Sequence, residues 1–184
     1  EDVWEYVAKL AHESYNVGFD EINFDYIRFP SDGDMKNVAY RYHNEELPKE
    51  LQIEEFFAYL ADEVGGEGIP ISADLFGMTS TNYDDLNIGQ VLERTLPHFD
   101  YVAPMVYPSH YPPHFIGIPE PAKEPYRVIK YSLDSAHARI IAATSTPNIF
   151  KDFAVPFLTP SFNPVITESK CFCGIEIIFE FKLV

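Results

Sequence analysis

Apolar and polar positions in the first three quarters of the chain follow the periods of strands and helices. Ile22 and Phe24 alternate with polar residues, which predicts a β-strand over 20–25. Further strands are predicted over 70–75 and 101–106. Helical spacing of apolar residues predicts helices over 2–16, 49–64, 88–96 and 124–138.

The last of these helices carries its larger apolar residues on one side. They are Tyr126, Ile129, Leu133 and Ala136. Strands and helices therefore alternate, and this order predicts an α/β fold with a parallel sheet and right-handed crossovers. A barrel and an open doubly wound sheet both fit the pattern. No glycine-rich phosphate turn follows any of the three strands, which disfavours a nucleotide-binding sheet.

Polar and aromatic residues gather where the predicted strands end. Asp25 ends the first strand, Asp74 lies at the end of the second, and Tyr107 follows the third. Enzymes built on α/β barrels place their catalytic groups at the carboxyl ends of the strands, where the connecting loops form the open face. We therefore predict one functional site made from all three strand ends.

Charge and composition disfavour some classes of binding partner. The chain has 184 residues and a formal net charge of −16, which disfavours binding to nucleic acids and to anionic membranes. No apolar run approaches the length of about 18 residues that membrane insertion needs. The net charge lies entirely within residues 1–138. Residues 139–184 change in character, and we expect them to form a separate, divergent segment with one strand-like stretch at 174–181.

Three stretches of sequence carry motifs at the predicted strand ends: GFDEINFDYIRFP at 18–30, SADLFG at 72–77 and PMVYPSHY at 104–111. Together they resemble a bacterial family of glycoside-hydrolase-like domains with a (β/α)8 barrel. The resemblance implies that residues 1–138 are the central part of a TIM barrel and contribute its fourth to sixth strands. It also implies that the upstream and downstream parts of the barrel complete the fold. A whole (β/α)8 domain needs about 250 residues, so we expect this chain to be an incomplete barrel.

Glycoside hydrolysis requires two carboxyl groups beside the scissile bond. We assign Asp25 as nucleophile or transition-state stabiliser and Asp74 as general acid/base, because adjacent parallel strands lie only about 4.8 Å apart. The first motif also resembles that of family 18 chitinases. In that alignment the catalytic glutamate falls on Ile27, which disfavours substrate-assisted chitinase chemistry.

Aromatic rings suit saccharide binding because sugars present apolar C–H faces that stack on them. The predicted substrate-binding residues are Tyr26, Arg28, Phe29, Tyr107, His110 and Tyr111. Arg28 has two interpretations: it holds a nearby carboxylate ionised, or it braces its loop. Nothing in the sequence indicates a cofactor. No cluster of His, Cys and carboxylate residues indicates a catalytic metal, and the acidic loop at 32–34 lacks the later ligands of a calcium loop.

The leading hypothesis is a glycoside hydrolase that acts on a polysaccharide, with glycans of the cell envelope as candidates. The alternative is a non-catalytic carbohydrate-binding or scaffold domain on the same barrel, since fold alone does not define function. A barrel enzyme of other chemistry is disfavoured by the lack of a strand-end lysine or a histidine-rich site. No targeting signal defines the compartment; the family resemblance is compatible with a location outside the cytoplasm.

Overall fold

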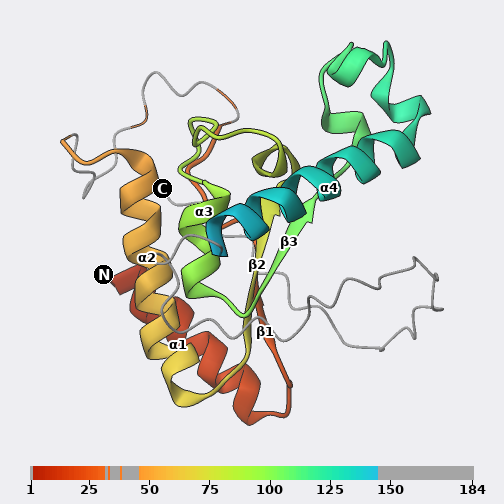
Figure 1. Cartoon of the computed structure of the whole chain (residues 1–184). Helices are drawn as coiled ribbons and strands as arrows, with labels where there is room; N and C mark the ends of the chain where they lie inside the picture. The colour runs from red at the N-terminus through yellow and green to blue at the C-terminus, as the bar shows by residue number, and fades with distance from the viewer. Residues whose placement is uncertain (1, 32, 34–37, 39–45, 145–184) are drawn as a thin grey trace.

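A small parallel sheet with helices packed along one side organises the chain (Figure 1). The computed structural model describes residues 2–31, 33, 38 and 46–144. The sheet has three strands in the order β1-β2-β3, all parallel. The strands are β1 (Ile22–Phe24), β2 (Ile71–Phe76) and β3 (Tyr101–Met105). The α-helices are α1 (Asp2–Asn16), α2 (Lys49–Glu63), α3 (Leu92–Thr95) and α4 (Pro125–Thr144).

These elements confirm the predicted α/β order and the parallel sheet. The helix predicted over 88–96 is shorter than expected. It consists of α3 and a following 3-10 turn, Leu96–His98, because Pro97 has no N–H group to continue the α-helical bonding. Helix α4 continues beyond residue 138 to Thr144. The sheet is the unit from which both a barrel and an open α/β sheet are built.

Several predicted features lie outside the described residues. They are the segment 145–184 with its strand-like stretch, and both acidic residues of the loop at 32–34. Within the described part of the chain, no helix combines the length and the apolar character that crossing a membrane requires.

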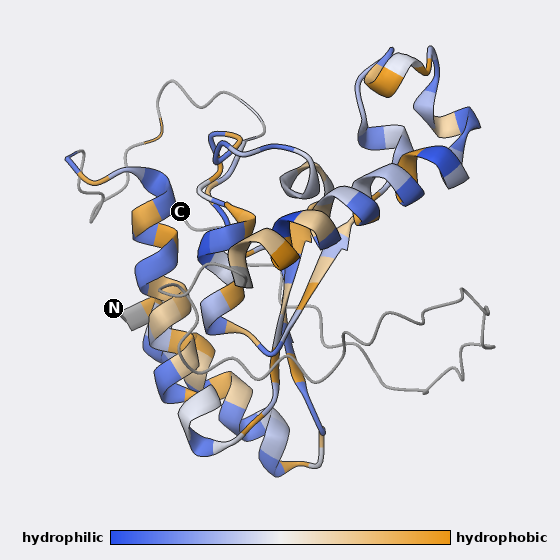
Figure 2. Ribbon diagram, viewed as in Figure 1, coloured by the Kyte–Doolittle hydropathy of each residue, from blue (hydrophilic) through white to orange (hydrophobic). Residues whose placement is uncertain are grey.

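The main core lies between the sheet and the first two helices. Ile22 and Phe24 of β1 and Leu75 of β2 share one buried cluster with residues of α1 and α2. Phe99 contacts the rings of Phe24 and Phe57 edge-on, with centroids 6.1 and 5.2 Å apart. Figure 2 shows orange segments on the strands and an alternation of orange and blue along α1 and α2, as expected for strands and amphipathic helices that bury one side.

Helix α4 buries a different side from the one that its larger apolar residues occupy. The buried positions on α4 are Val128, Ser132, Ala136, Arg139 and Ala143. By contrast, Tyr126, Ile129 and Leu133 are exposed by 75, 37 and 47%. The polar contacts of Arg139 and Ser132 lie on the packed side, so polar bonding as well as hydrophobicity fixes how α4 is rotated.

Arg139 anchors α4 to the rest of the domain. Its Nε and Nη2 donate to the two carboxylate oxygens of Glu93 on α3, at 2.7 and 2.5 Å. Its Nη1 donates to the carbonyl oxygens of Thr79 and Asn82, at 2.5 and 2.6 Å. Burial works to raise the pKa of the Glu93 carboxyl, but the hydrogen bonds and the charge of Arg139 outweigh it and hold this pKa below 4.5. Both charged groups of the pair therefore have hydrogen-bond partners.

We predict that the Glu93–Arg139 pair makes the domain sensitive to acid. Because the folded state lowers the pKa of Glu93, the pair stabilises fully above about pH 4.5, and this contribution is lost as the pH falls through the folded pKa. Glu93→Gln should be less stable than the wild type at pH 7, and the difference should shrink on acidification. Urea unfolding across this pH range measures both curves.

The matched control is Glu120→Gln, which removes an exposed ion pair with Lys123. Such pairs contribute little to stability, so this variant should follow the wild type at every pH. A difference between Glu93→Gln and the wild type that stays constant with pH would contradict the assigned role.

Candidate functional site

The register of β1 on β2 brings the two candidate carboxylates to neighbouring positions. The last paired residues are Phe24 and Ala73. Asp25 follows Phe24 and Asp74 follows Ala73 in the sequence. Neighbouring parallel strands are about 4.8 Å apart, so the two aspartates lie at the same level of the sheet. Asp25 directly follows β1, whereas Asp74 lies within β2, two residues before its last residue Phe76. Both side chains are half-buried.

Asp74 lies on the face of the sheet that turns away from the helices. Its neighbours Ala73 and Leu75 are fully buried in the helix-packed core, and side chains alternate between the two faces of a strand. An amide from β1 reaches across to this face. Asn23 Nδ2 donates to Ser72 Oγ at 3.0 Å and to Asp74 Oδ1 at 3.3 Å. The polar contact between β1 and β2 therefore orients the Asp74 carboxylate.

The chain turns sharply directly after Asp25. Tyr26 has a φ of 58°, a left-handed conformation that is uncommon outside glycine. Its backbone N–H donates to Asp25 Oδ1 at 2.6 Å. Residues held in such conformations cost stability and gather at functional sites, where the surrounding structure maintains them. This turn fixes both the Asp25 carboxylate and the Tyr26 ring.

Arg28 supports this turn. Its guanidinium carbon lies 4.3 Å from the centre of the Tyr26 ring, a cation–π contact. Nη1 donates to the Phe29 carbonyl oxygen and to Ser31 Oγ, both at 3.1 Å. The side chain is only 8% exposed. These contacts agree with the loop-bracing interpretation of Arg28.

The remaining predicted binding residues divide into buried and exposed side chains. Phe29 and Tyr111 are buried, and the Tyr111 hydroxyl lies 3.0 Å from Ser132 Oγ on α4. Tyr107 is 51% exposed, and the exposed His110 meets its ring edge-on with centroids 5.3 Å apart. Tyr107 and His110 therefore present aromatic surface to solvent beside the strand ends, whereas Phe29 and Tyr111 pack beneath the loops.

A buried glutamine joins the loop after β1 to the last residue of β2. Gln90 Oε1 accepts a hydrogen bond from the Phe76 N–H at 2.9 Å, and Nε2 donates to the Ile27 carbonyl oxygen at 3.3 Å. Ile27 and Phe76 each lie two residues beyond their aspartate. One side-chain amide, 1% exposed, therefore ties equivalent points of the two strand ends together. The sequence analysis missed Gln90, whose only signal is an uncharged amide within the apolar stretch 88–92.

The loop that carries Gln90 is itself held in place from two directions. The Phe29 N–H donates to the Ile88 carbonyl oxygen at 2.8 Å, and Lys49 Nζ donates to Asn87 Oδ1 at 2.8 Å. Gly89 has a φ of 82°, and a Cβ there would meet Ile53 Cγ1 at 2.6 Å. Only glycine allows this backbone to approach α2 so closely.

The second and third strand ends touch through backbone atoms. A Cβ on Gly77, the residue after β2, would lie 2.3 Å from the Met105 carbonyl oxygen at the end of β3. No side chain fits at that distance. Gly77 therefore allows the turn after Asp74 to pack directly against the turn that leads to Tyr107.

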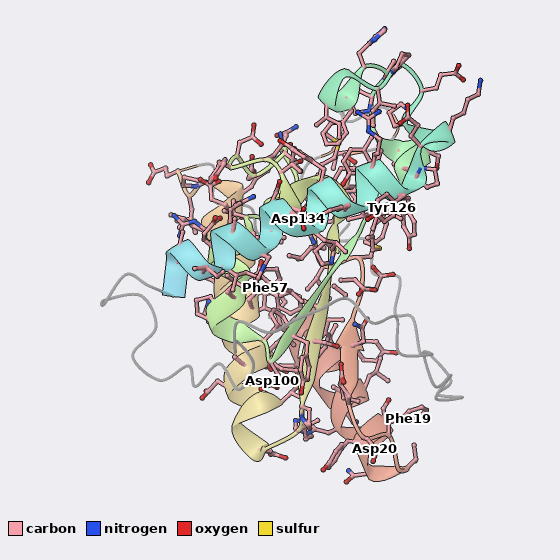
Figure 3. All side chains as sticks on the ribbon, turned by 45° about the vertical axis from the view of Figure 1, so that its right-hand side comes forward. Phe19, Asp20, Phe57, Asp100, Tyr126 and Asp134 are labelled. Atoms are coloured by element: carbon pink, nitrogen blue, oxygen red, sulfur yellow. The ribbon has the colours of Figure 1, made fainter. Side chains whose placement is uncertain are left out.

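At the amino-terminal end of the sheet, the aspartate Asp100 makes a structural hydrogen bond. Asp100 precedes β3, and its Oδ2 accepts a hydrogen bond from the Ile71 N–H at 2.9 Å. Figure 3 shows Asp100 and Asp20 at the amino-terminal end of the strands, away from α4. Among the described residues, no group of three or more His, Cys, Asp or Glu side chains is arranged to hold a metal ion. The acidic pair at the carboxyl end is thus the candidate chemical centre.

The chain belongs to a family described as "Putative glycosyl hydrolase domain", whose model matches residues 1–168. The matched region extends beyond residue 138, where the first segment was predicted to end. Neither the curated proteins nor the solved structures contain a match to this chain.

We predict that Gln90 contributes to stability through the two backbone groups that it satisfies. Gln90→Leu keeps a similar volume but leaves the Phe76 N–H and the Ile27 carbonyl without this partner, which should cost about 1–3 kcal/mol. The control Ser14→Ala removes a half-buried hydrogen bond to the Leu10 carbonyl oxygen within α1 and should cost less. Urea unfolding compares the variants. Equal losses would contradict the bridging role of Gln90.

We also predict that Gly77 cannot be replaced. Gly77→Ala places a methyl group against the Met105 carbonyl, so the backbone of one strand end must move, at a cost of about 1–3 kcal/mol or more. In Gly66→Ala the nearest atom is 3.9 Å away, and the reduced entropy of the unfolded chain should leave stability unchanged or slightly higher. Thermal melts of the two variants test this; a tolerated Gly77→Ala would contradict the close contact.

Proposed function

We propose that this chain carries the catalytic strand ends of a glycoside hydrolase that cleaves O-glycosidic bonds in a polysaccharide. The family description supports a glycosyl hydrolase and hence a carbohydrate substrate. We choose the two catalytic residues from the strand pairing. Phe24 pairs with Ala73, and each of these residues is followed by an aspartate. Two carboxylates at one level of a parallel sheet match the requirement of this chemistry.

The two aspartates take different roles. Asp25 acts as nucleophile or electrostatic stabiliser, because the short bond from the Tyr26 N–H holds its carboxylate as an acceptor beside the developing oxocarbenium ion. Asp74 protonates the leaving oxygen and, in the retaining geometry, then activates water. Retaining enzymes separate their carboxyls by about 5–5.5 Å and inverting enzymes by roughly 6.5–9.5 Å. Neighbouring strands support either spacing, depending on how the two side chains extend.

The exposed rings near the strand ends bind the sugar. Tyr107 stacks on a pyranose face, and His110, packed against Tyr107, donates or accepts hydrogen bonds with the hydroxyl groups. Tyr26, held by Arg28, contacts the sugar from the turn after β1. Phe29 and Tyr111 support these loops from below. The glycan is one that offers flat apolar faces, as polysaccharides of cell envelopes do.

The sheet is a part of a (β/α)8 barrel, in which β1 to β3 are the fourth to sixth strands. Its face opposite the helices supports this proposal. Tyr101 and Ala103 of β3 lie on that face and are exposed, Tyr101 by 62%. Within the described residues, β1 and β3 each pair along one edge only. Upstream and downstream parts of a barrel would cover both the face and the edges.

Neutralising either carboxylate should abolish hydrolysis without abolishing binding. In the full-length protein, Asp25→Asn and Asp74→Asn keep the side-chain shape but remove the charge or the titratable proton, so turnover should fall by about 100-fold or more. Saccharide affinity should change little. Tyr107→Ala should weaken binding through the loss of stacking. Release of reducing ends and isothermal titration with the same oligosaccharides measure the two effects.

The matched control is Asp20→Asn, an exposed aspartate at the other end of the sheet (Figure 3). It should retain both hydrolysis and binding. If the wild type binds saccharides but releases no reducing ends, the protein is a carbohydrate-binding module. If Asp25→Asn and Asp20→Asn hydrolyse equally well, the assignment of Asp25 is wrong.

A further inference from the structure

A cavity lies apart from the two aspartates, between α4, α3 and the turn after β2. Its volume is about 450 Å³, within the range of small-ligand sites. Residues of α4 form one wall and Ser80, Thr81 and Tyr83 form another. The small side chains of Ala138, Ala142 and Ala143 leave the space open.

Aromatic surface at this cavity is held in a fixed position. The Arg139 guanidinium carbon lies 4.3 Å from the centre of the Tyr83 ring, yet Tyr83 remains 75% exposed. The contact covers one part of the ring and leaves the rest open to a ligand. Tyr131 of α4 also lines the cavity, is 46% exposed, and is supported by an edge-on contact with Phe115 at 5.8 Å. The cavity therefore offers two ordered aromatic rings.

The polar groups of the cavity carry no net charge. Glu93 and Arg139 both line it and neutralise each other through two hydrogen bonds. An anion would meet the Glu93 carboxylate and a cation would meet the Arg139 guanidinium, so neither is favoured. The Arg139 donors are directed to Glu93 and to the carbonyl oxygens of Thr79 and Asn82, but the partly exposed Glu93 carboxylate still offers acceptor oxygens to neighbouring hydroxyl groups. Ser135 and Thr81 add hydroxyl groups to the lining.

We propose that this cavity is an accessory subsite for a neutral saccharide. Ordered tyrosine rings, hydroxyl groups and a neutral acid–base pair recognise the apolar faces and the hydroxyl groups of a pyranose. This inference rests on the proposed function, because it takes the ligand to be a further part of the same glycan. Ser80 is six residues beyond Asp74, so the cavity lies within about 20 Å of the strand end along the chain. The cavity lies among the helices, whereas Asp74 faces the other side of the sheet, so a glycan that occupies both places must pass over the strand ends.

Binding of oligosaccharides of two lengths tests the subsite. The probes are cellohexaose, chitohexaose and maltohexaose with their disaccharides, titrated calorimetrically into the full chain. Tyr83→Ala should weaken binding of the hexasaccharide by about fivefold, the loss expected for one stacking contact. Ala138→Trp fills the cavity without removing a polar contact and should weaken it similarly. The control Tyr6→Ala removes an exposed tyrosine of α1 and should have no effect.

Each result decides between the two sites. If Tyr107→Ala weakens binding while Tyr83→Ala and Ala138→Trp do not, the accessory subsite is wrong and the strand-end site stands. If only the cavity variants weaken binding, the subsite stands and the strand-end assignment fails. If the wild type binds none of these glycans, both proposals are wrong. Circular dichroism melts exclude variants that lose their fold, and Ala138→Trp then tests the subsite without Tyr83→Ala.

Discussion

The parallel register of β1 on β2 is the constraint on which the candidate site depends. Pairing of Phe24 with Ala73 makes Asp25 and Asp74 neighbours, whereas a shift by one residue would turn one of them to the helix-packed face. Burial of Ile22, Phe24 and Leu75 against the helices resists that shift. Gln90 adds a second connection, since it bonds to Ile27 in the loop after β1 and to Phe76 at the end of β2, each two residues beyond an aspartate.

Buried polar contacts also fix the conformation of the segments that follow the strands, including one strained residue. The left-handed Tyr26 is unfavourable alone, and Arg28 and the Asp25 carboxylate offset its cost. Arg139 performs a comparable role for α4, which it holds against α3 and the turn after β2. Buried polar groups that are fully bonded specify one arrangement more sharply than apolar contacts do. Buried polar contacts therefore hold the segments around the candidate aspartates in place.

The sequence predicted the three strands because they follow from local patterns, although Asp74 lies within β2 and does not end it. Alternation of Ile22 and Phe24 with polar residues identifies the strand, and Asp25 marks its end. The role of Gln90 could not be predicted, since its partners are backbone groups brought near by the fold. The packed side of α4 was also not predictable, because Arg139 and Ser132 occupy it through polar contacts while Leu133 stays exposed. Hydrophobic periodicity carries no information about such contacts.

The separation of the two aspartate carboxyls around a bound glycan tests the central claim most directly. A crystal structure of the full-length protein with an uncleaved oligosaccharide, obtained with the Asp25→Asn variant, provides this distance. The account predicts that the side-chain carbons of residue 25 and Asp74 lie on either side of one glycosidic oxygen, about 5–9.5 Å apart. A separation above about 10 Å, or a glycan bound with neither residue beside its scissile bond, would contradict it.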